Sequence, residues 1–318
     1  MMPEHSNYKP GDIIDLTPFS RKRELKPELL FEELAKISRD TNKRVSEKLG
    51  LSNLLDLDGS ISKSGFSKEN GGPYNKSKID NDIKEERIIE IKFARANNEI
   101  DPLKQEQLLQ KWKKEKRNFK STKVELLMTI FLNKQLGEDY VIMRSALIDD
   151  YGAGIDYIAV NIKTGETICT FDGVAENDSN ANEFSKTNSD KKITKIAQAG
   201  GANVKYGIQL VDGKLIRTQI SNVPVFYLSL LDKDFEILSE SIGKEPNAEI
   251  LKDESRIFTQ FINSLEKQQK DLLQLNLPKD SPVYKNILNF ENTLKNLREI
   301  SNRKNTEDTS NIKYKEAA

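Results

Sequence analysis

The stretch from Tyr140 to Val174, YVIMRSALIDDYGAGIDYIAVNIKTGETICTFDGV, decides the fold of this chain. It predicts three strands, over residues 140–148, 155–161 and 167–174, because apolar and β-branched residues alternate with polar ones along it. The segment KTGE at 163–166 separates the second and third strands, and Gly165 can adopt the positive φ that a tight reversal needs. Residues 155–174 therefore predict an antiparallel hairpin.

Outward from these strands, the sequence predicts a helix on each side. VELLMTIFLNKQLG at 124–137 precedes them, KKITKIAQAGG at 191–201 follows them, and residues 204–231 predict a closing pair of strands. The resulting order is helix, three strands, helix and strands. We therefore expect an α/β fold with a central mixed sheet of αβββαβ type over residues 121–232.

The rest of the chain is charged and helical. It predicts a flexible arm over 1–26, a helical region over 27–120, a helical hairpin over 233–302 and a disordered tail over 303–318. Within the helical region, a stretch rich in Ser, Gly and Asn at about 56–78 has the composition of a mobile linker. The core is thus expected to be flanked by N- and C-terminal helical extensions.

Composition excludes several classes of chemistry. The 318 residues contain one histidine, His5, and one cysteine, Cys169. Catalytic triads that use histidine and zinc sites of the Cys/His type are therefore excluded. The remaining candidate groups are carboxylates, lysines, tyrosines and hydroxyls, and the cations that suit such oxygen ligands are magnesium and manganese.

Charge and hydropathy bear on partners and location. Lysine plus arginine and aspartate plus glutamate both number 50, so the net charge is zero and a polyanion site would have to be a local basic patch. No apolar run is long enough to span a bilayer, and the first residues lack the apolar core of a signal peptide. We expect a cytoplasmic protein that does not engage a membrane.

Two aspartates stand where the predicted hairpin brings strand ends together. Asp156 opens the second strand and Asp172 ends the third, so antiparallel pairing places them close to opposite one another. Two carboxylates in such positions repel unless a cation lies between them. Glu125, at the start of an otherwise apolar helix, is a third candidate, whereas Asp149 and Asp150 are expected to form a turn.

This layout resembles the PD-(D/E)XK, or restriction-endonuclease-like, nuclease superfamily. Glu125 matches the glutamate of the first helix, Asp156 the aspartate of strand two, and Asp172 the acid of the acid-x-lysine triplet. The resemblance implies that these three hold magnesium or manganese for phosphodiester hydrolysis. Val174 stands where the triplet lysine should be, and Lys192 or Lys195 of the following helix could supply it instead. Both could equally be solvated lysines of an amphipathic helix.

A basic run precedes the core and is a candidate nucleic-acid contact. It interleaves cations with Trp112 and Phe119, a combination that can bind phosphates and stack on bases, or form a solvated helix face. The candidate contacts are Lys111, Lys113, Lys114, Lys116, Arg117 and Lys120.

The sequence therefore predicts a metal-dependent nuclease acting on nucleic acid, with DNA the expected substrate. The alternative is a catalytically inactive nuclease-like scaffold that acts through its helical arms, including self-association through the C-terminal hairpin. A nucleic-acid binder without catalysis is the third reading. Metal-dependent cleavage distinguishes the first from the other two.

Overall fold

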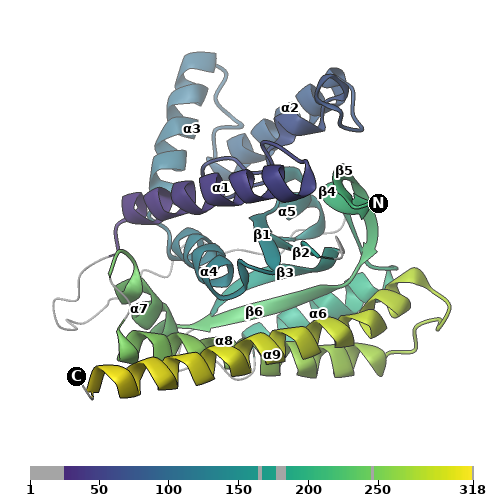
Figure 1. Cartoon of the computed structure of the whole chain (residues 1–318). Helices are drawn as coiled ribbons and strands as arrows, with labels where there is room; N and C mark the ends of the chain where they lie inside the picture. The colour runs from purple at the N-terminus through teal and green to yellow at the C-terminus, as the bar shows by residue number, and fades with distance from the viewer. Residues whose placement is uncertain (1–24, 164–166, 177–183, 245–246, 317–318) are drawn as a thin grey trace.

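A four-stranded mixed sheet lies between two helical layers in a computed structural model of the chain (Figure 1). The structure describes residues 25–163, 167–176, 184–244 and 247–316, and along 167–176, 184–189 and 305–316 the description is of the backbone. The flexible arm predicted over residues 1–26 lies, up to residue 24, outside the described residues. No helix in the described ranges is both long and apolar enough to cross a membrane.

The sheet has the order β1-β2-β3-β6. Strands β1 (Tyr140–Arg144), β2 (Tyr157–Asn161) and β3 (Thr167–Glu176) pair antiparallel, whereas β3 and β6 (Val225–Leu231) pair parallel. Parallel neighbours need a crossover connection. Here the chain makes it through α6 (Phe184–Gln198) and a separate hairpin of β4 (Ala202–Val211) and β5 (Lys214–Val223).

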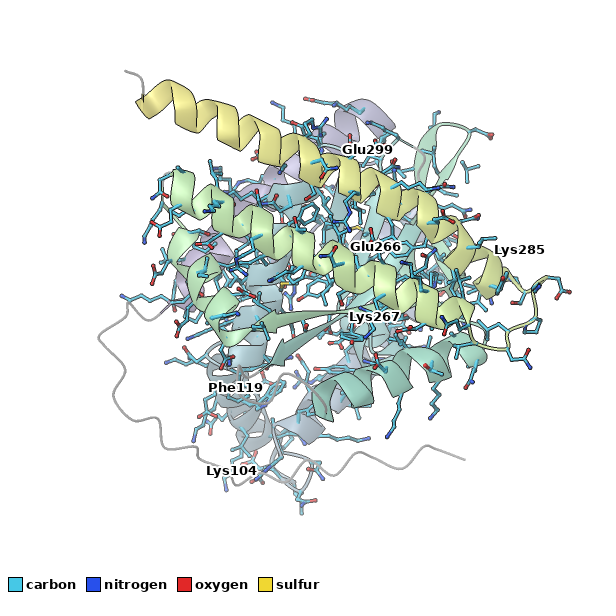
Figure 2. All side chains as sticks on the ribbon, turned by 90° about the horizontal axis from the view of Figure 1, so that it is seen from below. Lys104, Phe119, Glu266, Lys267, Lys285 and Glu299 are labelled. Atoms are coloured by element: carbon cyan, nitrogen blue, oxygen red, sulfur yellow. The ribbon has the colours of Figure 1, made fainter. Side chains whose placement is uncertain are left out.

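Helices cover both faces of the sheet. On one face, α4 (Lys120–Leu136) packs against β1 and β3, and α1 (Pro27–Leu49) packs on α4. On the other face, α6 and the pair α8 (Ala248–Leu273) and α9 (Pro282–Glu316) lie along β6 (Figure 1). Figure 2 shows α8 and α9 side by side, with Glu266 and Lys267 on α8. The short α7 (Asp232–Ser241) joins β6 to this layer.

Local chemistry explains where these helices begin and end. Pro27 stands in the first turn of α1, and Gly50 closes it with φ +69°. Asn75 caps α2 (Lys76–Phe93), and Asp101 caps α3 (Pro102–Lys116), each through its side-chain oxygen. The apolar stripe of α8 is buried inside the chain, so the C-terminal hairpin covers its own sheet. Self-association through it stays a prediction.

Residues 145–153 differ from the predicted strand and turn. The strand ends at Arg144, and Leu147–Ala153 form a helix, α5. Its start is stabilised from a distance, because the Glu86 carboxylate on α2 accepts a hydrogen bond from the Ile148 N–H at 2.9 Å. The sequence predicted a closing pair of strands, but the structure has three, β4, β5 and β6, because Pro224 separates β5 from β6.

The stretch 56–78, whose composition predicts a mobile linker, is folded against the core. It contains two 3₁₀ turns, at Lys63–Phe66 and Lys68–Asn70, and it buries Phe66 and Tyr74. The chain just before this stretch is held by Arg217 of β5, which donates hydrogen bonds to the carbonyls of residues 52 and 53, at 2.6 and 2.9 Å. The tail from residue 303, predicted to be disordered, continues α9 as helix to Glu316.

Candidate functional site

The register of the sheet brings the positions of two aspartates together. Tyr157 pairs with Phe171 across β2 and β3. Asp156 precedes Tyr157 and Asp172 follows Phe171, so the two aspartates occupy the next pair of opposing positions. Asp172 also stands in register with Tyr227 of β6. The pairing between β1 and β2 also continues to Asp156, because the Asp156 carbonyl accepts a hydrogen bond from the Ser145 N–H at 2.9 Å.

Lys192 of α6 reaches the chain just before Asp156. Gly154 has φ +64° and ends α5, with its N–H donating to the Asp150 carbonyl at 2.7 Å. A Cβ atom at Gly154 would lie 2.6 Å from Nζ of Lys192, so the ammonium group rests directly on this glycine. Lys195 is exposed one turn further along α6. The two candidate lysines are therefore in different environments, and only Lys192 is shown to reach this glycine.

A cavity opens beside this contact. It has a volume of about 470 Å³ and lies between α5, α6 and the start of β4. Gly152 and Ala153 line it from α5, and Ile196 lines it from α6. The cavity leaves room for a ligand next to the α5–β2 connection that carries Asp156.

Val174 lies on β3, in register with Ser229 of β6. The resemblance to the PD-(D/E)XK superfamily implies a lysine at this position, as the last residue of the acid-x-lysine triplet. A valine cannot supply positive charge, so a cation at this site has to come from another element. Lys192 of α6 is a cation that lies against Gly154, two residues before Asp156.

Glu125 lies on the opposite face of the sheet and is already paired. Its carboxylate is 26% exposed and accepts a hydrogen bond from Nη2 of Arg144 at 3.3 Å. Asp58 lies 3.4 Å from the same guanidinium. Burial alone would lower the pKa of Arg144, but the charges of Asp58 and Glu125 outweigh it and the pKa is raised. Arg144 therefore stays charged and holds both carboxylates.

Strand geometry separates Glu125 from Asp156. The Tyr157 hydroxyl donates to the Glu125 carbonyl at 3.1 Å, so Tyr157 points toward α4. Consecutive residues of an extended chain point to opposite faces, which directs Asp156 toward the face that carries α6. Among the side chains that the structure describes, no three His, Cys, Asp or Glu residues could together hold a metal ion.

Asp149 has a different role from the turn-forming one that its sequence context predicts. It is buried on α5 and accepts the backbone N–H groups of Lys205 and Tyr206, at 2.7 and 3.0 Å. Burial raises its pKa to about 6, although these two hydrogen bonds favour the charged form. Asp149 thus fastens α5 to β4.

Sequence reasoning missed a buried polar network behind α5. Asp82 on α2 accepts hydrogen bonds from Nζ of Lys205 at 2.5 Å and from the Tyr206 hydroxyl at 2.7 Å. Glu86, one turn later, pairs with Lys63 as well as with the α5 backbone. The i, i+4 spacing of Asp82 and Glu86 with the buried Ile79 was the available signal. It was hidden because α2 is rich in solvated charges.

The basic run, which extends from α3 to the start of α4, is partly neutralised. Lys113 pairs with Glu90 at 2.7 Å, Lys111 lies 4.0 Å from Glu115, and Lys120 pairs with Asp232. Lys114, Lys116 and Arg117 have no carboxylate within ion-pair distance among the described side chains. The candidate nucleic-acid contacts are therefore divided into three paired and three unpaired cations.

No family model matches the sequence, and neither a comparison with curated proteins nor one with solved structures finds a match.

Proposed function

We propose that the chain is a magnesium- or manganese-dependent nuclease of the PD-(D/E)XK type. The observation that carries the proposal is the juxtaposition of three positions. Asp156, immediately before β2, stands opposite Asp172 on β3, and Nζ of Lys192 rests on Gly154, two residues before Asp156. Two carboxylates and one lysine at the end of a hairpin suit a phosphodiester held by a hard cation.

The order of elements supports the same proposal. Disregarding two insertions, the order is α4, β1, β2, β3, α6 and β6, which is the αβββαβ order of that superfamily. The insertions are α5, between β1 and β2, and the hairpin β4–β5, between α6 and β6. Both lie beside the candidate site, and the α5 insertion ends at the glycine that Lys192 contacts.

Each residue has a proposed task. Asp156 and Asp172 would hold the cation, which when bound supplies positive charge and lowers the pKa of a coordinated water. Lys192 would bind a non-bridging phosphate oxygen and orient the water for in-line attack. Lys195, exposed on the same helix, is the second candidate for this task. We assign Glu125, which the resemblance implies as a third ligand, to holding Arg144.

Cleavage assays test the proposal. Single- and double-stranded DNA and RNA are incubated with the protein in manganese, magnesium or EDTA. We expect manganese- or magnesium-dependent cleavage that falls at least about a hundredfold in Asp156→Asn and in Lys192→Gln, since each removes a charge-stabilising group. Asp212→Asn, at the tip of the β4–β5 hairpin, and Lys191→Gln, next to Lys192, are the matched controls and should cleave normally.

Two results would overturn the proposal. One is cleavage by Asp156→Asn at the wild-type rate, and the other is no cleavage of any substrate by a folded wild-type protein. The second result would favour a catalytically inactive nuclease-like scaffold. Two features favour that alternative: the ion pair between Glu125 and Arg144, and the valine at position 174.

A further inference from the structure

Three aromatic rings from three separate elements meet beside α3. Phe93 ends α2, Trp112 lies on α3, and Tyr151 lies on α5. The rings of Phe93 and Trp112 are nearly parallel, with an interplanar angle of 8° and centroids 6.2 Å apart. Tyr151 lies 5.4 Å from Phe93 at a tilt of 33°. The cluster thus joins the helical region to the connection that leads into Asp156.

Phe93 is 56% exposed although it stacks on another ring. A phenylalanine that only stabilised the fold would be expected to bury most of its surface, because apolar area left in water forgoes about 25 cal/mol per Å². A stacked pair that is open to solvent instead offers a flat π surface. Such surfaces accept the faces of nucleic-acid bases without regard to sequence.

Positive charge surrounds this pair. The Lys116 ammonium lies 5.3 Å from the Trp112 ring and 5.9 Å from the Tyr151 ring, both within cation–π range. Lys114 and Arg117 lie close by on the chain, and none of these three has a carboxylate within ion-pair distance among the described side chains. Glu90 is the nearby acid of α2, and Lys113 neutralises it at 2.7 Å. Asp150, next to Tyr151 in the sequence, is a further acid whose charge acts on the Tyr151 hydroxyl. Lys114, Lys116 and Arg117 supply the positive charge that complements phosphate.

We propose that Phe93, Trp112 and Lys116 form a stacking site for the unpaired bases of single-stranded nucleic acid. Lys114 and Arg117 would contact the phosphates beside the stacked bases. This inference rests on the proposed function and names its substrate as a single strand, since bases in a duplex have no free faces to offer. Tyr151 connects the stacking site to the candidate catalytic centre, because α5 carries both Tyr151 and the end that contacts Lys192.

Binding can be measured without cleavage. Trp112 is the only tryptophan in the chain, so fluorescence excited selectively from tryptophan, away from the tyrosine absorption, reports on this site. In EDTA, titration with a 12-nucleotide oligo-dT or oligo-U should quench the fluorescence, and a 12-base-pair duplex should bind at least tenfold more weakly. Because EDTA removes the metal, this result is independent of whether the protein cleaves nucleic acid.

Variants of Phe93 test whether its aromatic ring is responsible for single-strand binding. Phe93→Ala should weaken single-strand binding about 5- to 140-fold, the equivalent of one lost base stack. Phe93→Leu, which keeps apolar volume without a π face, should weaken it to a similar degree and melt like the wild type. The matched control is Leu103→Ala, which removes an exposed apolar side chain at the start of α3, outside the basic run, and should bind normally. Lys114→Gln, which removes one of the proposed phosphate contacts, should reduce the salt dependence by about 0.7 in log–log slope.

Three outcomes would overturn the inference. They are unchanged Trp112 fluorescence on addition of single strands, equal affinity of wild type and Phe93→Leu, and equal affinity for duplex and single strand. Unchanged fluorescence would leave the site as a contact for another protein. Cleavage without quenching would reject the stacking site and keep the nuclease, and quenching without cleavage would do the reverse.

Discussion

Two carboxylates only seven residues apart, Asp149 and Asp156, are in different environments. Asp149 is buried against the backbone of β4, and Asp156 is half-buried where α5 leads into β2. A buried carboxylate resists ionisation, because the protein interior solvates its charge poorly. The structural role of Asp149 therefore comes with a dependence on pH that can be measured.

Stability should fall as the pH rises through the titration of Asp149. Its pKa is raised in the folded protein from an ordinary value of 3.8 to about 6, so the folded state binds more protons than the unfolded state between these values. The free energy of unfolding then decreases from about pH 4 to about pH 6 and levels off above. Asp149→Asn should lack this loss, which amounts to about 3 kcal/mol. Urea denaturation of both proteins from pH 4 to pH 7 checks it, and a difference that does not vary with pH would contradict it.

Gly154 allows a matched comparison of two helix ends. Gly50 and Gly154 both end helices with positive φ, but only at Gly154 does another side chain, Lys192, occupy the space of a Cβ atom. Alanine at either position should cost about 1 kcal/mol through backbone strain. Only Gly154→Ala should also displace the Lys192 ammonium and reduce nuclease activity. If the two variants had equal nuclease activity, Lys192 would have no role in the proposed chemistry.

At the scale of elements, β6 is an edge strand of the sheet, and one side chain binds the backbone of its residue Tyr227. The Gln268 amide on α8 accepts the Tyr227 N–H and donates to the Tyr227 carbonyl, both at 2.9 Å. It thereby replaces the partner strand that the edge lacks. This contact docks the C-terminal helices on the same residue of β6 that is in register with Asp172.

Removal of the Gln268 amide should destabilise the fold strongly. In Gln268→Leu, the buried N–H and carbonyl of Tyr227 lose their hydrogen bonds with Gln268, at about 1–3 kcal/mol for each group. We expect a loss of about 2–5 kcal/mol in chemical denaturation. Lys267→Ala, the exposed neighbour on α8 (Figure 2), should change stability by less than about 0.5 kcal/mol. A small effect of Gln268→Leu would mean that water or a repacked side chain satisfies Tyr227.

The sequence predicted elements where local pattern and tertiary packing agree. The amphipathic spacing of α1 and α8 and the reversal after β2 are local signals. The register between Asp156 and Asp172 also depends on a shift of one residue in the pairing between Ala159 and Val160, which the sequence did not predict. The sequence did not predict α5, because Ala146–Ile148 is a short apolar run that suits a strand or a helix equally. What selects the helix is Glu86, more than fifty residues earlier, and Asp149 bonding to β4.

The candidate site was predictable to the same extent. Strand order and helix spacing predict Asp156, Asp172 and either Lys192 or Lys195, and only the contact with Gly154 separates the two lysines. The pairing of Glu125 with Arg144 does not, because it also depends on Asp58 in a loop whose composition resembles a linker. The sequence did not predict the stacking of Phe93, because nothing in the sequence of α2 shows that its last residue will pack on Trp112.

At the scale of the whole molecule, charges that balance overall are arranged as bridges between layers. Lys134 on α4 pairs with Glu254 on α8 at 2.6 Å, and Lys120 pairs with Asp232 at the start of α7. Lys205 on β4 likewise pairs with Asp82 on α2. These three ion pairs connect elements that are distant in the sequence. Lys114, Lys116 and Arg117, by contrast, have no carboxylate within ion-pair distance among the described side chains.

The parallel pairing of β3 and β6 has a consequence for the time order of folding. Thr170 pairs with Val225, 55 residues later, and α6 and the β4–β5 hairpin lie between them. Contacts between distant residues require a large loop to close before they yield any gain, so they form late. During synthesis, the strand that carries Asp172 leaves the ribosome well before its partner exists. The two aspartates can meet early through the β2–β3 hairpin, but the sheet that fixes them is completed only when Leu231 has emerged.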